Sequence, residues 1–593
     1  MSSQHQGAIT AARVYHGRTV QNFELARLFY EMATLLEVRN ESVFRVRAYQ
    51  RAARMLESLT EDLATVTARG GLQKLPGIGK DLAARIDEFL RTGRLAQLDA
   101  MRTDLPPRFL TLLEIRGLGP RTAKLLWDRL GVDTVERLEE LCRTKEILQV
   151  DGIREKTCEN ILKGIAIWRA GRTRALLPKA RAVAEHVAEA LRAHGGVERL
   201  EVAGSLRRMR ETVKDVDILV TSTDPKRVID TLTSLPSVIE VIARGDTKAS
   251  VRHQDGLQVD LRVVEPEAFG SALQYFTGSQ SHNVRVRELA KRRGLTISEY
   301  GVFEEKSGRR VAGGTEEDVY ATVGLPWIPA ELRENAGEID AARNGGLPEL
   351  VTTDSIRGDL HAHTDWSDGH LSLEKLVAAA EDRGYEYIAV SDHSRSDTIA
   401  GGLGIDELRA QVRQIRQLQA SHRIRILAAS ECAILADGTM DFPDEVLDEL
   451  DIVLAAVHSR FKQTREEMTA RIVRALGHPK VHVLAHPTGR LLGSRDPYDV
   501  DLEAVFAAAR RHGKALEINA SPERLDLADV HARRAAELGI PIAINTDTHY
   551  LTNFDNLALG VAVARRAWIG PSQVLNARPL AELVGWTQRA RSA

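Results

Sequence analysis

The chain has 593 residues, of which 43% are hydrophobic and 28% charged, with a net charge of -2 and a mean hydropathy of -0.23. This ordinary globular composition excludes fibrous and largely disordered classes, and at about 100 to 200 residues per domain it predicts about three to five domains. No apolar run approaches the ~20 residues of a membrane span, and the polar opening segment lacks a signal-peptide core. We therefore expect a cytoplasmic protein that does not contact membranes.

Charge and histidine are unevenly distributed along the chain. Residues 1–180 carry 30 Lys and Arg against 22 Asp and Glu, a surplus of +8, whereas the remainder carries 51 against 61, or -10. A basic N-terminal region fits contact with nucleic-acid phosphates, although a solvated helical surface gives the same bias. Twelve of the 18 histidines follow residue 350, and the three cysteines form no C-x-x-C pair. Any metal is therefore expected on His and carboxylate ligands in the C-terminal part.

Hydrophobic periodicity divides the chain into regions. From about residue 19 to 168, apolar residues recur at three- and four-residue spacing, which predicts short helices. From residue 198, strands and helices predict a mixed sheet, and a Pro-, Gly- and acid-rich stretch at 326–350 then indicates a linker. Beyond it, apolar strands alternate with helices, which is typical of a parallel barrel or wound sheet. The predicted fold is multidomain α and α/β, with a boundary near residue 176.

Two Gly-rich turns precede helical segments in the N-terminal region. Residues 75–79 and 115–119 share the order apolar, x, Gly, apolar, Gly, and residues 150–154 form a third copy in which Arg154 replaces the second glycine. These turns resemble helix-hairpin-helix motifs, in which glycines bring N–H groups at a helix N-terminus against a DNA phosphate. A structural helix connection explains one copy, but two matched copies favour DNA contact. The expected DNA-contacting residues are Gly77, Gly79, Lys80, Arg85, Gly117 and Gly119.

Three aspartates and a Gly-Ser-Leu-Arg-Arg turn mark the mixed-sheet region. Asp215 and Asp217 alternate along one predicted strand and so point to one face, where Asp260 of another strand can join them. Clustered carboxylates repel unless cations neutralise them, and two Mg²⁺ ions about 3.5 to 4 Å apart serve in-line phosphoryl transfer. A solvated D-x-D on an edge strand is the alternative. The turn at residues 204–208 favours the metal site, because its hydroxyl, N–H and guanidinium groups can bind triphosphate oxygens.

The sequences G-S-L-R-R, D-V-D, V-D-L-R and Y-F-T-G-S together resemble the family X DNA polymerases, from the hairpin repeats to Pro329. The resemblance implies a lyase-like domain at 17–105, fingers at 106–175, a nucleotidyltransferase palm at 176–270 and a thumb at 271–335, with a linker at 336–357 before the C-terminal domain at 358–593. It also implies that Asp215 and Asp217 hold both metals and that Asp260 helps to activate the primer 3′ hydroxyl. Implied nucleotide-binding residues are Gly204, Ser205, Arg208, Tyr275, Phe276, Gly278, Asn283 and Arg287, of which the last two contact the nascent base pair unless they form a solvated helix face. Gln258 departs from the vertebrate repair member, which has Arg there, so the orientation of Asp260 is expected to differ.

Metal-ligand side chains recur at the ends of successive C-terminal strands. The set comprises His361, His363, Asp368, His393, Glu431, His458, His486, Asp547 and His549. A single His at a strand end is more often structural, but in a parallel barrel the strand C-termini converge on one face, where nine such residues would meet. The remaining histidines of this region are expected to be ordinary surface or core residues: His370, His422, His478, His482, His512 and His531.

This ligand set resembles the polymerase and histidinol phosphatase (PHP) domain, a distorted barrel with a trinuclear metal site. The resemblance implies three metals, held by the groups His361, His363, Glu431 and Asp547; Glu431, His458 and His486; and Asp368, His393 and His549. A metal-acidified water would attack a phosphoester bond, and this ligand chemistry suits Mn²⁺ or Zn²⁺ better than the Mg²⁺ expected in the palm.

The two resemblances occur in the order of bacterial and archaeal family X polymerases that carry a C-terminal PHP domain. We expect a DNA repair polymerase that fills gaps, with a metal-dependent 3′-5′ exonuclease, and an abasic-site endonuclease is left open. Its expected partners are gapped or primer-template DNA and deoxynucleoside triphosphates, and the chain is expected to be a monomer. A small-molecule phosphoesterase and a non-catalytic DNA-binding factor are the alternatives.

One activity of the polymerase family is expected to be weak or absent. In the gapless match of residues 74–89 to the lyase segment of the vertebrate enzyme, Arg85 stands at the position of the nucleophilic lysine. Arginine remains protonated and cannot readily form a Schiff base with a 5′-deoxyribose phosphate, although it can bind the phosphate. Lys80 is a possible substitute, but a helix places it ~140° around the axis from Arg85.

Overall fold

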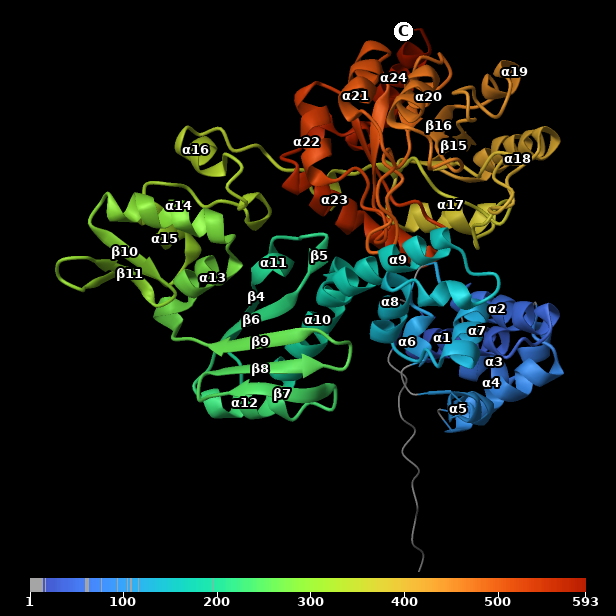
Figure 1. The fold of residues 1–593 in the computed structure, drawn as a ribbon. Coiled ribbons are helices and arrows are strands. Elements are labelled where there is room, and N and C mark those ends of the chain that lie inside the picture. Colours follow the sequence, from blue (N-terminus) through green and yellow to red (C-terminus); the bar gives the residue numbers. More distant parts are fainter. Residues whose placement is uncertain are drawn as a thin grey trace, which may run out of the picture. The chain divides into compact units, whose positions relative to one another are not determined.

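The computed structural model describes residues 14–15, 18–58, 63–75, 77–92, 94–103, 105–106, 109–115, 117–194 and 196–592. Pro76 and Arg116 of the two Gly-rich turns, and residue 17 at the first expected domain boundary, lie outside these residues. The chain forms two compact units, Met1–Ala170 and Gly171–Ala593 (Figure 1). In the described part of the chain, no helix is long and apolar enough to cross a membrane.

The first unit is helical, as its apolar spacing predicts. In α4 (Lys80–Thr92), for example, Leu82, Ala83, Ile86 and Phe89 recur on one face and are buried. One apolar cluster runs through the unit from Leu25 to Ile165. The other elements are β1 (Val14–Tyr15), β2 (Arg18–Thr19), α1 (Val20–Val38), α2 (Val43–Ser58), α3 (Leu63–Ala68), α5 (Ala96–Thr103), α6 (Phe109–Leu112), α7 (Pro120–Leu130), α8 (Val135–Arg143) and α9 (Glu155–Thr173).

The second unit begins with a mixed sheet in the order β4-β6-β9-β8-β7, in which β6 and β9 are parallel neighbours. Along β6, alternate residues such as Val216 and Ile218 enter the core that α10 and α12 share, while Leu219 packs on Phe269 of α13 on the other face. The elements are β3 (Ala175–Leu176), α10 (Leu177–His194), β4 (Arg199–Val202), α11 (Gly204–Arg207), β5 (Thr212–Val213), β6 (Asp215–Thr221), α12 (Pro225–Thr233), β7 (Val238–Arg244), β8 (Lys248–His253) and β9 (Gln258–Val263).

A small α/β region follows, and it includes much of the stretch expected as a linker. The apolar residues of 326–350, such as Leu332, Ile339 and Leu350, join the apolar cluster of this region, whereas many of the residues between them are exposed. The elements are α13 (Phe269–Thr277), α14 (Gln280–Lys291), β10 (Leu295–Ser298), β11 (Gly301–Glu304), β12 (Arg310–Ala312), α15 (Glu316–Thr322), η4 (Ala330–Leu332) and α16 (Glu338–Arg343).

The C-terminal part is a barrel of parallel strands in sequential order from β13 to β19. A bridge between Ala362 and Thr548 joins the segments that directly follow its first and last strands, so the sheet nearly closes, which confirms the barrel alternative. The elements are β13 (Gly358–Asp359), α17 (Leu373–Asp382), β14 (Tyr387–Val390), α18 (Ile405–Leu418), β15 (Arg425–Ala433), α19 (Asp444–Leu447), β16 (Ile452–Ala456), α20 (Arg465–Leu476), β17 (Val483–Leu484), α21 (Leu502–Arg511), β18 (Ala515–Asn519), α22 (Asp529–Glu537), β19 (Ile542–Asn545), α23 (Leu557–Arg566) and α24 (Leu580–Ser592).

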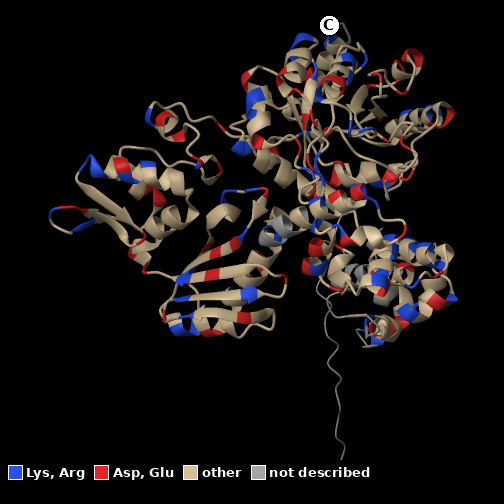
Figure 2. Ribbon diagram, viewed as in Figure 1, with Lys and Arg blue, Asp and Glu red and all other residues tan. Residues whose placement is uncertain are grey.

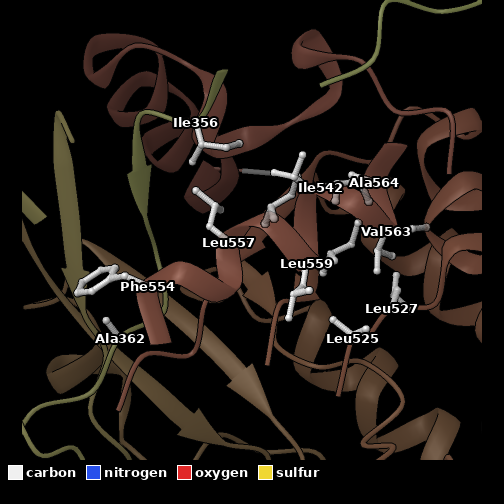
Figure 3. Packing of buried hydrophobic residues seen from close by; sticks show 14 of the residues in the cluster. Ile356, Ala362, Leu525, Leu527, Ile542, Phe554, Leu557, Leu559, Val563 and Ala564 are labelled. Atoms are coloured by element: carbon white, nitrogen blue, oxygen red, sulfur yellow. The ribbon is translucent and has the colours of Figure 1, made fainter. Parts of the chain in front are cut away.

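Because side chains alternate between the two faces of each strand, the barrel has an apolar core on each face of its sheet. On one side of the strands, residues such as Ile542 pack in one apolar cluster with Leu557, Leu559 and Val563 of α23 (Figure 3). On the other side, small and branched residues pack with Trp586 of α24. Because both faces are apolar, polar side chains concentrate where the strands end.

Candidate functional site

The acidic cluster of the mixed sheet is built by the register of β6 and β9. Asp217 pairs directly with Asp260 across the parallel ladder, and Asp215 pairs with Gln258. Asp215 and Asp217 alternate with the buried Val216, so both lie on the face opposite the α10 core. Figure 2 shows acidic positions within these strands. The register therefore gathers the three aspartates expected from the sequence.

Burial and mutual repulsion perturb this cluster. Burial, together with the charges of Asp215 and Asp260, raises the pKa of Asp217 to about 7. The Asp260 carboxylate is oriented by Gln258, whose Nε2 lies 3.1 and 3.0 Å from its two oxygens, and by the hydroxyl of Ser250. Gln258 thus gives Asp260 a neutral hydrogen-bond donor as its neighbour on β9. A divalent cation is the group that would relieve the repulsion of these carboxylates.

The Gly-Ser-Leu-Arg-Arg turn lies directly against the cluster. Gly204 has φ +66°, which is strained for other residues, and a Cβ atom there would approach Asp217 Oδ2 to 2.2 Å, so a larger residue would displace the Asp217 carboxylate. The turn forms the short helix α11 after β4, and the N–H of Ala203 donates to the carbonyl of Asp217 at 2.8 Å. Ser205 and Arg208 are thereby held beside the aspartates.

A cavity of about 660 Å³ lies at this turn, within the size range of small-molecule sites. Its lining includes Asp215, Asp217 and every nucleotide-binding residue expected from the sequence: Gly204, Ser205, Arg208, Tyr275, Phe276, Gly278, Asn283 and Arg287. Asn283 is buried and bonded through its side chain to Gln274 and to the carbonyl of Tyr275, so it does not belong to a solvated helix face. Arg287 is exposed. Sequence reasoning missed other polar wall residues: Arg174, Arg210, Lys214, Gln280 and Glu334.

The nine ligand-type residues of the barrel meet at the strand ends. Three overlapping groups have ligand atoms within 4.8 Å of one another: His363, Asp368, His393 and His549; His361, His363 and Asp547; and His393, Glu431 and His458. Glu431 is central, with Oε1 2.6 Å from His486 Nε2 and 3.0 Å from His458 Nε2, and Oε2 3.1 Å from His393 Nδ1. His363 reaches toward both Asp547 and Asp368. His393 therefore lies close to Glu431 as well as to Asp368 and His549, the residues of its expected metal group.

The donor set of the barrel fits metal ions. Several buried ring nitrogens make no well-oriented hydrogen bond, although carboxylate oxygens lie within ion-pair distance of some of them: His361 Nε2, both nitrogens of His363, His393 Nδ1, His458 Nδ1 and His486 Nδ1. Unpaired buried polar atoms are costly, and cations would satisfy them. Burial acts to raise the pKa of Glu431, but the surrounding imidazoles outweigh it and hold that pKa well below its usual range. Asp368 is partly exposed, so the site is open on its side.

Supporting carboxylates were not foreseen from the sequence. Glu517 in β18 is fully buried, and its Oε1 accepts a hydrogen bond from His361 Nδ1 at 2.8 Å, which leaves His361 Nε2 for a metal. Its Oε2 accepts from the backbone N–H of His486 at 2.8 Å. Asp397 Oδ2 lies 3.3 Å from His458 Nδ1. A charged residue within the apolar strand ALEIN was the signal for Glu517, whereas Asp397 lies in a loop without a distinctive pattern.

The hairpin turns of the first unit share one geometry. Gly77, Gly117 and Gly152 have φ between 79 and 89°. The residue after each glycine donates its N–H to the carbonyl of the residue two positions before that glycine, as Ile78 does to Leu75. The third turn therefore keeps this geometry despite Arg154. Gly77, Gly79, Lys80 and Arg85 line a cavity of about 530 Å³ together with Arg45, Tyr49 and Glu88. Lys80 and Arg85 share this cavity despite their angular separation, because Lys80 is the first residue of α4.

Comparisons with known proteins agree with this arrangement. Family models match the chain as a helix-hairpin-helix domain at residues 20–95, a SAM-like helix-hairpin-helix tandem at 109–166, a DNA polymerase beta thumb at 272–334 and a PHP domain at 359–521. The chain is 37% identical over 571 residues to the DNA polymerase/3′-5′ exonuclease PolX of Bacillus subtilis (strain 168), covering 95% of this chain and 99% of that protein. The chain belongs to the PolX family. This confirms the expected family X polymerase with a C-terminal PHP domain.

Two more distant relatives each match one part of this PolX family chain. A probable phosphatase of Thermoanaerobacter sp. (strain X514) is 27% identical over 233 residues, which are 37% of this chain and 89% of that protein. DNA polymerase lambda of Arabidopsis thaliana is 26% identical over 319 residues, which are 48% of this chain and 57% of that protein. Membership of the PolX family implies an enzyme that uses divalent metal ions.

Proposed function

We propose that this PolX family chain fills short gaps in DNA during repair by two-metal nucleotidyl transfer and trims 3′ ends with its PHP domain. Its substrates are gapped or primer-template DNA and deoxynucleoside triphosphates, and it acts as a monomer. The observation that carries the polymerase proposal is the pairing of Asp217 with Asp260 beside a cavity that all the expected nucleotide-binding residues line.

In the palm, Asp215 and Asp217 would hold two Mg²⁺ ions, which when bound neutralise the charge that develops on the phosphates. Asp260, oriented by Gln258, faces Asp217 and helps to activate the primer 3′ hydroxyl. Ser205 and Arg208 bind the triphosphate, and Tyr275 and Phe276, in edge-to-face contact at 5.1 Å, form the wall on the sugar side. Asn283 and Arg287 contact the nascent base pair.

In the barrel, the nine ligands would hold Mn²⁺ or Zn²⁺, which when bound acidify the water that attacks a phosphodiester. The three ligand groups overlap through His363 and His393, and the short distances from Glu431 to His361, His363 and His458 support Glu431 as the carboxylate shared between two metals. We propose 3′-5′ exonuclease action here, and abasic-site endonuclease action as a second use of the same centre. Both reactions hydrolyse a phosphodiester in DNA.

In the first unit, the hairpin turns bind DNA phosphates through Gly77, Gly79, Gly117 and Gly119. Arg85 binds a 5′ phosphate in the cavity it lines, with no efficient lyase step because arginine offers no neutral amine. The presence of Lys80 in that cavity makes it the one lysine to test.

Extension and degradation of a labelled primer on one-nucleotide gapped DNA, with Mg²⁺ and Mn²⁺ compared, test both activities at once. We expect nucleotide addition and 3′ shortening. Hydrolysis of histidinol phosphate without either reaction would instead support a small-molecule phosphoesterase. DNA binding without any metal-dependent chemistry would support a non-catalytic DNA-binding factor.

A further inference from the structure

The PHP barrel contacts the nucleotide-binding turn of the palm through a buried arginine. Arg566, at the end of α23, has a side chain only 2% exposed. Its Nη1 donates to the backbone carbonyl of Arg208 at 3.2 Å and to Glu334 Oε1 at 3.2 Å, and its Nη2 donates to Asp529. One side chain of the phosphoesterase domain thus holds both the backbone of a triphosphate-binding residue and a carboxylate in the wall of the nucleotide cavity.

Glu334 is shared by several guanidinium groups. Its Oε1 lies 3.0 Å from Arg208 Nε, 3.2 Å from Arg566 Nη1 and 3.7 Å from Arg210 Nη1. Arg208 also donates through Nη1 to the carbonyl of Thr277 at 2.5 Å. A carboxylate bonded to Arg208 competes with the phosphates of an incoming nucleotide for the same cation. Arg566 donates a hydrogen bond to the same Glu334 oxygen and so weakens that competition.

We propose that Arg566 is a positioning residue of the polymerase site, contributed by the PHP domain, which keeps Glu334 from withholding the Arg208 guanidinium from the triphosphate. The inference rests on the proposed nucleotidyl transfer. A second contact supports it: Arg490, four residues after the barrel ligand His486, is bonded to Glu211 at the start of the segment that leads to Asp215. The PHP barrel therefore contacts the palm at both Arg208 and Glu211.

The test is steady-state insertion of one nucleotide into gapped DNA by the full chain. In Arg566→Ala, Glu334 retains only its ion pairs with Arg208 and Arg210 among these guanidinium groups, so it competes more strongly with the triphosphate for Arg208. We therefore expect KM for the nucleotide to rise ~10-fold while kcat stays within ~2-fold of the parent, which is the pattern of lost ground-state binding. Arg565→Ala is the matched control. Arg565 precedes Arg566 on α23 and bonds Glu331 at 2.7 Å and the carbonyl of Val351, without a contact to Arg208. It should leave both constants unchanged.

The double variant separates this role from simple domain docking. Adding Glu334→Gln to Arg566→Ala removes the competing carboxylate, so KM should return to within ~3-fold of the parent. An unchanged KM in Arg566→Ala, an equal rise in Arg565→Ala, or no recovery in the double variant would each overturn the proposal. If Arg566→Ala does not fold, the single variant Glu334→Gln tests the inference, because Arg566 retains its ion pair with Asp529 there. KM for the nucleotide should fall in this variant, and a rise in KM would contradict the inference. Absence of nucleotide insertion by the parent chain would instead overturn the proposed function.

Discussion

Glu517→Gln is the substitution that best tests how the barrel centre is supported. Each oxygen of Glu517 accepts two hydrogen bonds: Oε1 from His361 Nδ1 and Asn545 Nδ2, both at 2.8 Å, and Oε2 from the His486 N–H at 2.8 Å and Asn519 Nδ2 at 3.2 Å. All four partners are donors. Glutamine offers one oxygen and one NH₂ group, so in either orientation a donor faces two donors.

The magnitude follows from those contacts. Two lost hydrogen bonds at about 1 kcal/mol each, with buried donors left unpaired, predict a loss of at least ~2 kcal/mol in the arrangement of the ligands. Loss of a carboxylate that orients a metal-bound histidine typically lowers metal affinity or activity ~10- to 100-fold. We therefore expect Glu517→Gln to lose exonuclease activity and barrel metal by such a factor while nucleotide insertion is kept, because Glu517 lies among the barrel ligands and not in the palm.

Exonuclease rates and elemental analysis of the dialysed protein provide the measurement. Glu503→Gln is the control, since Glu503 is exposed and forms an ion pair with Arg534 on the barrel surface. It should behave as the parent chain does. Full metal content and a parental exonuclease rate in Glu517→Gln would refute the reasoning that Glu517 holds His361 and His486 for metal binding.

Three further predictions concern the palm and the hairpin unit. Gly204→Ala should lower nucleotide insertion ~100-fold with exonuclease kept, because its Cβ would lie 2.2 Å from Asp217 Oδ2, and a parental insertion rate would contradict this packing. Because the pKa of Asp217 is raised to about 7, the metal-free fold binds this proton more tightly than the unfolded chain and loses stability as pH rises from about 4 to 7. Added Mg²⁺ should therefore raise Tm more at pH 8 than at pH 6, and Asp217→Asn should flatten that difference; an unaltered pH dependence in the variant would count against it. Borohydride should trap little adduct on a 5′-incised abasic substrate, and an efficient adduct lost in Lys80→Ala but kept in Lys74→Ala would show that Lys80 performs the lyase step.

Much of this arrangement was predictable because it depends on periodicity. Strand alternation placed Asp215 and Asp217 on one face, and parallel strand ends gathered His361, Glu431 and Asp547, since both effects are local consequences of strand geometry. Glu517, Glu334 and Arg566 were not foreseen, because their partners lie tens to hundreds of residues away in sequence. The stretch at 326–350 was expected as a linker because its Pro, Gly and acidic residues outweighed the apolar positions that pack in the structure.

We propose that one chain carries two separate catalytic centres, and a pair of single substitutions, one in each centre, tests this. Asp217→Ala and Glu431→Ala are compared with the parent on the same gapped, labelled primer, with nucleotide present or omitted. We expect Asp217→Ala to degrade the primer without extending it, because the barrel ligands are untouched, and Glu431→Ala to extend without degrading, because the palm aspartates are untouched. Loss of both reactions in either well-folded variant, or persistence of extension in Asp217→Ala, would contradict the assignment of the two centres.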